Sequence, residues 1–198
     1  SRIYSKKKSG RITELEKVVS DGVMASIAIG HTRWATHGKP TDKNAHPHCD
    51  CTGKIYLVHN GIIENFKELR LKLEKRGHTF KSDTDTEVAA HLIEDFSNPL
   101  AGGYSFEESV RLALKSIVGT YAFVIVNADN PTTMIVARNS SPLLIGFSDV
   151  DPASHGSLSA NTHKFVASDA SAILPHTRKV VYLHDDEFAI LTPSDFCI

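Results

Sequence analysis

The sequence predicts an α+β fold with largely antiparallel sheets, and two observations carry this prediction. Helical spacing of apolar residues is found only before residue 118, mostly in the middle of the chain. After that point, short strand-like segments follow one another with turn residues between them. Strict alternation of strands and helices would favour a parallel sheet, whereas strands in runs favour packed antiparallel layers.

Composition limits the class of protein. The 198 residues, of which 41% are hydrophobic, are enough to bury the core of one domain. The 22 basic and 23 acidic residues give a net charge of -1, so the basic excess of a nucleic-acid-binding protein is absent. Cys49, Cys51 and Cys197 are too few for a disulfide scaffold, and no secretory leader or long apolar span is present. These features favour a reduced, cytoplasmic protein.

The first third of the chain predicts one helix and two strands. Apolar residues at helical spacing predict a helix over residues 11–19, and the apolar run that follows predicts a buried strand over residues 25–30. A second strand is predicted over residues 54–59. It is expected to stop at Asn60 and Gly61, because Asn-Gly is the strongest turn dipeptide of the sequence. Such a turn would place backbone amides at a strand end.

Three helices are predicted in the middle of the chain. The first is marked by apolar residues that share a face, namely Ile62, Phe66, Leu69 and Leu73. It closes at Gly77, where a left-handed cap costs a glycine little. The second runs over residues 86–96, after a segment, 82–85, whose hydroxyls and carboxylates suit helix capping. The third runs over residues 106–117, where Ser105 and a glutamate three residues later form a capping box.

The last part of the chain is rich in predicted strands. They are short, apolar and separated by turn residues, and they cover residues 120–126, 134–137, 143–146, 164–167, 180–183 and 188–191. Residues 148–162 contain Asp-Pro, His-Gly and several serines. We expect this stretch to be a surface insertion between two strands.

The densest group of functional side chains lies in residues 30–38, directly after the predicted buried strand. It combines a guanidinium, the only tryptophan, two hydroxyls and two imidazoles. Arg33 can hold a carboxylate through two parallel charge-assisted hydrogen bonds. A structural salt bridge beside a core Trp34 explains the same residues, and the chemistry alone does not choose between the two interpretations.

A second group surrounds Asn60 and Gly61. A side-chain amide beside a glycine N–H provides two donors that can converge on one oxygen, as an oxyanion hole requires. An ordinary turn before the next helix is the competing interpretation. Without other information, turn statistics favour that interpretation.

Two further groups have simpler explanations. The carboxylates of residues 82–87 can bind a substrate ammonium, but helix capping explains them as well. His46, His48, Cys49 and Cys51 are metal-ligating residue types. Their spacing is not that of a zinc knuckle and no second ligand cluster follows, so no metal site is expected.

Five segments, taken in order, resemble a known family. They are His31–Gly38, Asn44–Pro47, Val58–Asn65, Thr84–Glu87 and Ser141–Gly146. They resemble the glutaminase domain of glutamine:fructose-6-phosphate amidotransferase (isomerizing; glucosamine-6-phosphate synthase), of the class II glutamine amidotransferase family. Relatives in purine synthesis, glutamate synthase and asparagine synthetase share this domain.

The resemblance implies a four-layer αββα sandwich of the N-terminal-nucleophile hydrolase type. It implies hydrolysis of the glutamine side-chain amide, with ammonia delivered for conversion of fructose 6-phosphate to glucosamine 6-phosphate in amino-sugar biosynthesis. The implied partners are L-glutamine, C-terminal sugar isomerase domains of the parent protein and further copies in a homo-oligomer. No metal or organic cofactor, no nucleic acid and no membrane is implied.

The resemblance also implies roles for residues that grip the substrate. Arg33 would bind the α-carboxylate of glutamine and Asp85 its α-ammonium group. Thr36 and His37 would line the same end of the pocket. Trp34 would lie between the glutamine pocket and the route taken by ammonia.

The resemblance further implies the catalytic groups. Asn60 and Gly61 would stabilise the tetrahedral oxyanion. The nucleophile of the family is a cysteine at the mature N-terminus, with its own α-amine as the base. Here residue one is Ser1, and residues 1–11 align with the interior of the family.

We therefore expect residues 1–198 to be one glutaminase domain that lacks its first strands and the sugar isomerase domains. Unpaired sheet edges and exposed apolar surface are expected to result, and this chain alone is expected to be inactive. The alternatives are a non-catalytic glutamine-binding module or fragment lacking the N-terminal cysteine, and a related amidotransferase with another acceptor.

Overall fold

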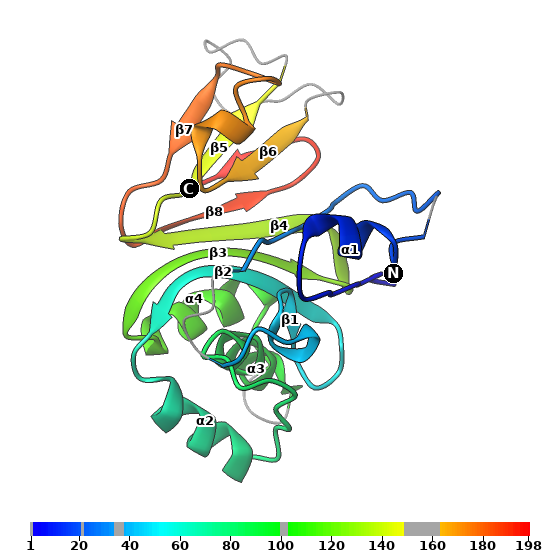
Figure 1. The fold of residues 1–198 in the computed structure, drawn as a ribbon. Coiled ribbons are helices and arrows are strands. Elements are labelled where there is room, and N and C mark those ends of the chain that lie inside the picture. The colour runs from blue at the N-terminus through cyan, green and yellow to red at the C-terminus, as the bar shows by residue number, and fades with distance from the viewer. Residues whose placement is uncertain (1, 21, 34–37, 100–102, 149–162) are drawn as a thin grey trace.

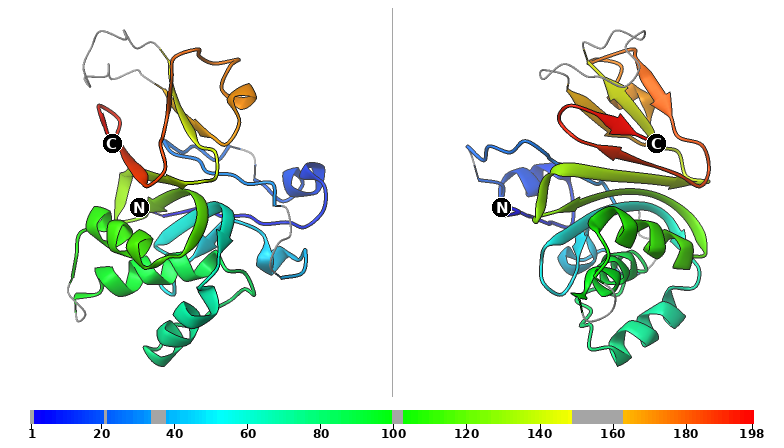
Figure 2. Two further views of the ribbon diagram at one scale, coloured as in Figure 1. Left: turned by 90° about the vertical axis from the view of Figure 1, so that its left-hand side faces the viewer. Right: turned by 180° about the vertical axis from the view of Figure 1, so that it is seen from behind.

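A computed structural model describes residues 2–20, 22–33, 38–99, 103–148 and 163–198 (Figure 1). It has the predicted α+β fold, with a six-stranded sheet, a three-stranded sheet and antiparallel pairing between all neighbouring strands. Three helices cover one face of the large sheet, and the small sheet packs on its other face (Figure 2). Among the described helices, none combines the length and apolarity needed to cross a bilayer.

The large sheet has the order β1-β2-β3-β4-β8-β9. Its strands are β1 His48–Cys49, β2 Ile55–Ile63, β3 Gly119–Asn127, β4 Asn130–Asn139, β8 Glu187–Leu191 and β9 Phe196–Cys197. The strands β2, β3 and β4 are the longest and form its middle. The short strands β1 and β9 at its two edges were not predicted from the sequence.

Strand β3 shows how the sequence builds two cores. Side chains alternate between the faces of a strand. Phe123 and Ile125 belong to the core under the helices, whereas Ala122 and Val124 contact the core between the sheets. Because β3 has apolar residues on both faces, it takes part in both cores and positions the side chains that it directs into the space between the two sheets.

The helix layer consists of α2 Phe66–Lys75, α3 Glu87–Ser97 and α4 Phe106–Ser116 (Figure 1). Helix α3 is buried along most of its length, between the sheet and the other helices. Ser105 accepts a hydrogen bond from the N–H of Glu108 at 3.3 Å, which confirms the predicted N-cap. The bounds of α3 and α4 agree with the prediction to within about one residue.

The small sheet places β5 Leu144–Phe147 between β6 Lys164–Ala167 and β7 Val180–Tyr182. Its outer face is covered by the 3-10 helix η3 Ala170–Ala172 and the residue after it, Ile173. A Cβ on Gly146 would lie 2.5 Å from Ile173 Cγ2, so glycine is what lets η3 approach β5. In the part of the chain that the structure describes, the layers are thus helices, large sheet, small sheet and η3.

The predicted turn at Asn60 and Gly61 is wrong. Strand β2 continues through both residues, and the pairing with β3 runs to Ile63 opposite Gly119. Gly61 has φ 129, and a Cβ there would lie 2.1 Å from the carbonyl oxygen of Thr120. The glycine is needed for close approach of β3, and the long pairing outweighs the local turn preference. Ile62, predicted to begin a helix, lies in β2 for the same reason.

The prediction for the start of the chain is also wrong in part. The helix α1 Ile12–Glu16 is shorter than predicted and has no buried residue. Residues 25–30 form no strand and are mostly exposed, because no described strand pairs with them. Large apolar side chains such as Ile12 and Met24 are exposed there. The expected surface insertion is described only at Ser148, since residues 149–162 lie outside the described residues.

Candidate functional site

A cavity of about 580 Å³ opens between the two sheets, beside the end of β2. Most of its polar lining comes from three segments that are distant in sequence, namely residues 30–32, the end of β2, and residues 84–86 before α3, and His46 and Ser168 add to it. The apolar lining consists of Val58, Ala122, Val124, Leu143, Val166 and Ala167. Three of the residues predicted from the sequence, Asn60, Gly61 and Asp85, line this one cavity.

The side chain of Asn60 is oriented by a histidine. Its Oδ1 lies 2.7 Å from Nε2 of His31, so a proton on this nitrogen is donated to the amide oxygen. The amide nitrogen of Asn60 is then the donor that the side chain offers. Nδ1 of His31 is buried, with no hydrogen-bond partner among the residues that the structure describes.

Asp85 is almost completely buried at the wall of the cavity, with 3% of its surface exposed. Its Oδ2 accepts a hydrogen bond from the backbone N–H of Ile63 at 2.8 Å. The sequence placed the capping of α3 in residues 82–85, whereas the N-cap residue of the structure is Thr86, which makes no side-chain cap hydrogen bond. Instead Glu87 reaches back and accepts from the backbone N–H groups of Lys81 and Ser82 at 2.7 and 2.6 Å.

Arg33 lies next to the cavity in sequence but is not among its described lining residues. Its guanidinium donates to the carbonyl oxygens of Gly38 at 2.9 Å and Lys39 at 3.1 Å. These bonds shape the loop that leads to Asn44, which in turn accepts from the N–H of Asp83 at 2.9 Å. The Arg33 loop is therefore tied to the segment that carries Asp85. Trp34, Thr36 and His37 lie outside the described residues.

The sequence analysis assigned no role in the glutamine site to His31, His46 or His59. His31 and His46 stack at a centroid distance of 4.0 Å, and the N–H of His59 donates to Nδ1 of His46 at 3.3 Å. His59 itself stacks on Phe123 and contacts Thr86 Oγ1 at 3.0 Å. All three histidines lie inside the motifs that carry the resemblance, so motif membership was the signal that could have found them.

Burial keeps these imidazoles neutral. It lowers the pKa of His59 to about 4, although the charge of Asp85 acts in the opposite direction. Burial likewise lowers the pKa of His31 and, far more strongly, that of His46. At neutral pH the buried carboxylate of Asp85 thus faces no cation from these rings. A ligand with a positive group would be favoured beside it.

Comparison with known proteins identifies the family. The model of the glutamine amidotransferase domain family matches residues 31–158, which include every motif of the resemblance. The chain belongs to this family. This glutamine amidotransferase domain is 48% identical over 100% of its length to a glutamine–fructose-6-phosphate aminotransferase [isomerizing] of Pyrococcus horikoshii, and 50% identical over 98% to that of Thermococcus kodakarensis.

The domain spans about a third of these two curated relatives, 31% and 30% of their lengths. Among solved structures, it resembles a glutamine phosphoribosylpyrophosphate amidotransferase from B. subtilis. The identity is 27% and the TM-score 0.60, over 82% of this chain and 32% of that one. Its fold is that of the N-terminal-nucleophile hydrolase amidotransferases, as the motifs implied.

Proposed function

We propose that the cavity binds L-glutamine and that this domain supplies the substrate grip and the oxyanion donors of a glutaminase. The observation that carries the proposal is that Asn60, Gly61 and Asp85 line one cavity. Asp85 holds the α-ammonium group, because a buried carboxylate next to neutral imidazoles favours a cation. Arg33 holds the α-carboxylate from the adjoining loop. Trp34, Thr36 and His37 keep the roles that the resemblance implies.

Asn60 and Gly61 act on the other end of the substrate. A thiolate attacks the side-chain carbonyl carbon, and its oxygen becomes an oxyanion that hydrogen-bond donors stabilise. The carbon–nitrogen bond then breaks, ammonia leaves, and water hydrolyses the thioester to glutamate. The thiol is the N-terminal cysteine of the mature parent protein, as the resemblance implies, because Cys49, Cys51 and Cys197 do not line the cavity.

The names of the curated relatives support a proposal for the whole protein. We infer that sugar isomerase domains follow this domain and use the ammonia to convert fructose 6-phosphate to glucosamine 6-phosphate. We place the protein in the cytoplasm as a homo-oligomer. A glutaminase coupled to another acceptor is the competing proposal, and it predicts no glucosamine 6-phosphate from the full-length protein.

Steady-state kinetics of the full-length protein tests the site. Asp85→Asn is expected to raise the KM for glutamine at least tenfold, and Arg33→Ala to act in the same direction. Asn60→Ala is expected to lower kcat by about 10²–10³-fold. Asp129→Asn is the matched control, because Asp129 pairs with Lys54 at the surface and does not line the cavity. Equal effects at Asp129 and Asp85 would refute the proposal.

A further inference from the structure

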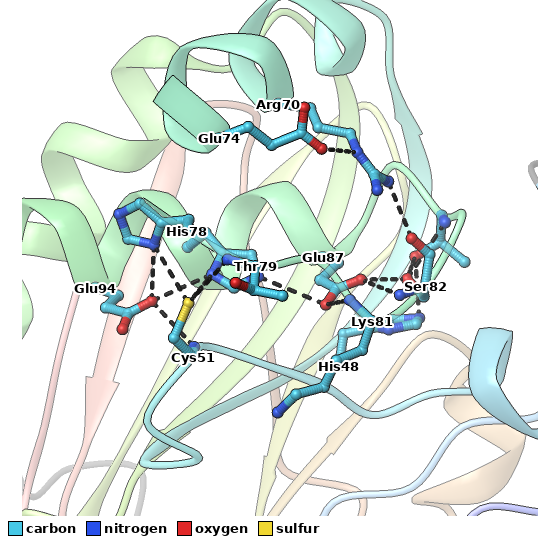
Figure 3. A network of polar contacts seen from close by, with 12 residues as sticks. His48, Cys51, Arg70, Glu74, His78, Thr79, Lys81, Ser82, Glu87 and Glu94 are labelled. Carbon is cyan, nitrogen blue, oxygen red and sulfur yellow. Dashed lines mark hydrogen bonds and ion pairs between the residues drawn. The ribbon is translucent and has the colours of Figure 1, made fainter. Parts of the chain in front are cut away.

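A second polar cluster lies under helix α3, formed by residues that the proposed glutaminase site does not use. Cys51 follows β1, His78 follows α2, and His91 and Glu94 belong to α3 (Figure 3). One ligand atom from each residue can be chosen so that all four lie within 4.8 Å of one another. Cys51, His78 and Glu94 approach one another from three separate segments (Figure 3), and His91 supplies the fourth ligand atom.

Four distances between ligand atoms of the cluster are near those of tetrahedral metal coordination. With metal–sulfur and metal–nitrogen bonds of about 2.3 and 2.0 Å, sulfur and nitrogen lie about 3.5 Å apart in a zinc site. Cys51 Sγ lies 3.5 Å from His91 Nδ1 and 3.7 Å from His78 Nδ1. Glu94 Oε2 lies 3.2 and 2.9 Å from the same two nitrogens, close to the value of about 3.3 Å for nitrogen and oxygen ligands.

Hydrogen bonds explain part of this arrangement, because Glu94 Oε2 also accepts from the backbone N–H of Cys51 at 3.0 Å, and, against the lowering effect of burial, Glu87 and Glu94 raise the pKa of His91. They leave the two imidazole contacts of the sulfur unexplained. Both Nδ1 atoms face the same sulfur and the same carboxylate oxygen. A thiol has one proton, which can serve only one of the two imidazoles. The sulfur also accepts a hydrogen bond from the N–H of Thr79 at 3.3 Å. Burial raises the pKa of the Cys51 thiol and this hydrogen bond opposes it, so a bound cation is what would favour the thiolate. One cation at the centre would satisfy all four groups at once.

Carboxylates outside the cluster face the other ring nitrogens. His78 Nε2 lies 3.5 Å from Asp95 Oδ1, and His91 Nε2 lies 3.5 Å from Glu87 Oε1. A metal-bound histidine usually directs its second nitrogen to a carboxylate, which fixes the ring and its tautomer. The side chain of His91 is 1% exposed and that of His78 10% exposed, so both rings are also held by packing.

We propose that Cys51, His78, His91 and Glu94 bind one zinc ion. The mixture of one thiolate, two imidazoles and one carboxylate suits zinc among the common divalent metals. Four protein ligands complete a tetrahedral shell, so the ion is structural and not catalytic. It joins the loop after β1 to α3, whose first residue follows the cavity-lining segment 84–86. This proposal departs from the expectation, drawn from sequence, that the chain holds no metal.

Metal content and cobalt substitution test the site in the full-length protein. Purified protein is stripped with a chelator and titrated with Zn²⁺ and, separately, with Co²⁺. We expect one equivalent of tightly bound zinc that depends on Cys51, and a higher melting temperature with zinc than without. With Co²⁺ we expect a thiolate charge-transfer band and the intense d–d bands of tetrahedral coordination.

Variants with matched controls separate this site from other metal binding. Cys51→Ser and His78→Gln are each expected to weaken zinc binding at least tenfold. In the cobalt spectrum, Cys51→Ser is expected to abolish the thiolate band, and His78→Gln to alter the d–d bands. Cys49→Ser and His184→Gln lie outside the cluster and are expected to bind as the parent protein does. Asp95→Asn, which also removes an ion pair with Arg76, is expected to weaken binding about 10–100-fold.

Two results would overturn the proposal. One is no zinc-dependent rise in melting temperature together with no tetrahedral cobalt spectrum. The other is zinc binding that Cys49→Ser weakens as much as Cys51→Ser. The two proposals can fail independently. Glutaminase kinetics of Cys51→Ser, measured on variant protein that is shown to be folded, distinguishes them, because a failed metal site leaves the roles proposed for Asn60 and Asp85 unchanged.

Discussion

Asp85 accepts a hydrogen bond from the backbone N–H of Ile63 at 2.8 Å, and this contact joins two parts of the site. Ile63 is the last residue of β2, the strand that carries Asn60 and Gly61. The carboxylate proposed to hold the ammonium end of glutamine is thus tied to the strand proposed to stabilise the oxyanion. One oxygen of Asp85 therefore has a structural role, in addition to the binding role proposed for its charge.

Two substitutions of Asp85 are expected to separate these roles. Asp85→Asn keeps an acceptor for the Ile63 N–H and should keep most of the stability while losing affinity for glutamine. Asp85→Ala leaves a buried N–H without its partner and should also lower the free energy of unfolding by about 1–3 kcal/mol. Urea denaturation measures the difference. Equal stability of the two variants would show that the Ile63 contact contributes nothing.

Gly61→Ala is expected to destabilise the fold and disturb the site together. The residue has φ 129, and the added Cβ would lie 2.1 Å from the carbonyl oxygen of Thr120. The strained backbone alone costs about 1–3 kcal/mol, and the clash forces β2 and β3 apart. Gly77→Ala is the control, because Gly77 has φ 96 with nothing within 4 Å of its Cβ position. Urea midpoints should fall further for Gly61→Ala, and equal falls would contradict the clash.

Stability is expected to fall in mild acid because buried histidines must become charged. Burial lowers the pKa of His59 to about 4 and that of His48 to about 3, from an ordinary value of 6.5. The unfolded chain therefore binds more protons than the folded one below pH 6.5. The stability that comes from keeping these histidines neutral should be fully present above pH 6.5. The free energy of unfolding should then fall toward pH 4, by ~1.4 kcal/mol per pH unit for each such histidine.

The substitution His59→Gln tests the origin of this slope. Removing one of the buried histidines should reduce the pH dependence of the free energy of unfolding between pH 6.5 and 4 by ~1.4 kcal/mol per unit. His184→Gln, at an exposed position, should leave the slope unchanged. Denaturant curves at several pH values provide the measurement. An unchanged slope for His59→Gln would mean that this ring is not held neutral by the fold.

The elements that could be predicted from the sequence are those whose signal is local. Strand β6 has the predicted bounds, because its apolar residues and its flanking turn residues lie within a few positions. The end of β2 could not be predicted in this way. Its last residues are held by pairing with β3, which begins 56 positions after β2 ends, as the bounds Ile63 and Gly119 show. The local turn preference of Asn60 and Gly61 contains no information about pairing with β3.

The same distinction applies to the two clusters of functional residues. The order of the motifs indicated Asn60, Gly61 and Asp85, and the fold brings these three to one cavity. The cluster around Cys51 has no sequence signature, because His78 is separated from it by 27 positions. The sequence analysis grouped Cys51 with the histidines that are its neighbours in the chain. In the structure His46 instead stacks on His31, and the sulfur faces His78 and His91.

Asn44→Ala is expected to weaken glutamine binding although Asn44 does not line the cavity. Its side chain is completely buried, accepts from the N–H of Asp83 at 2.9 Å and donates to the carbonyl oxygen of Lys39 at 3.0 Å. Arg33 donates to that same carbonyl oxygen. Removing the amide leaves the carbonyl of Lys39 and the N–H of Asp83 with fewer partners and releases the Arg33 loop from the Asp85 segment, at a cost of about 0.5–1.5 kcal/mol in stability for each hydrogen bond lost.

Calorimetry with glutamine and urea denaturation, both on the full-length protein, measure the two effects of Asn44→Ala. The matched control is Asn139→Ala, which removes a hydrogen bond to Asp186 at the surface and should change neither quantity by much. Lower stability with unchanged glutamine affinity would show that the loop keeps its binding geometry without Asn44. Loss of both would support a substrate grip whose two ends are held in place by one buried amide.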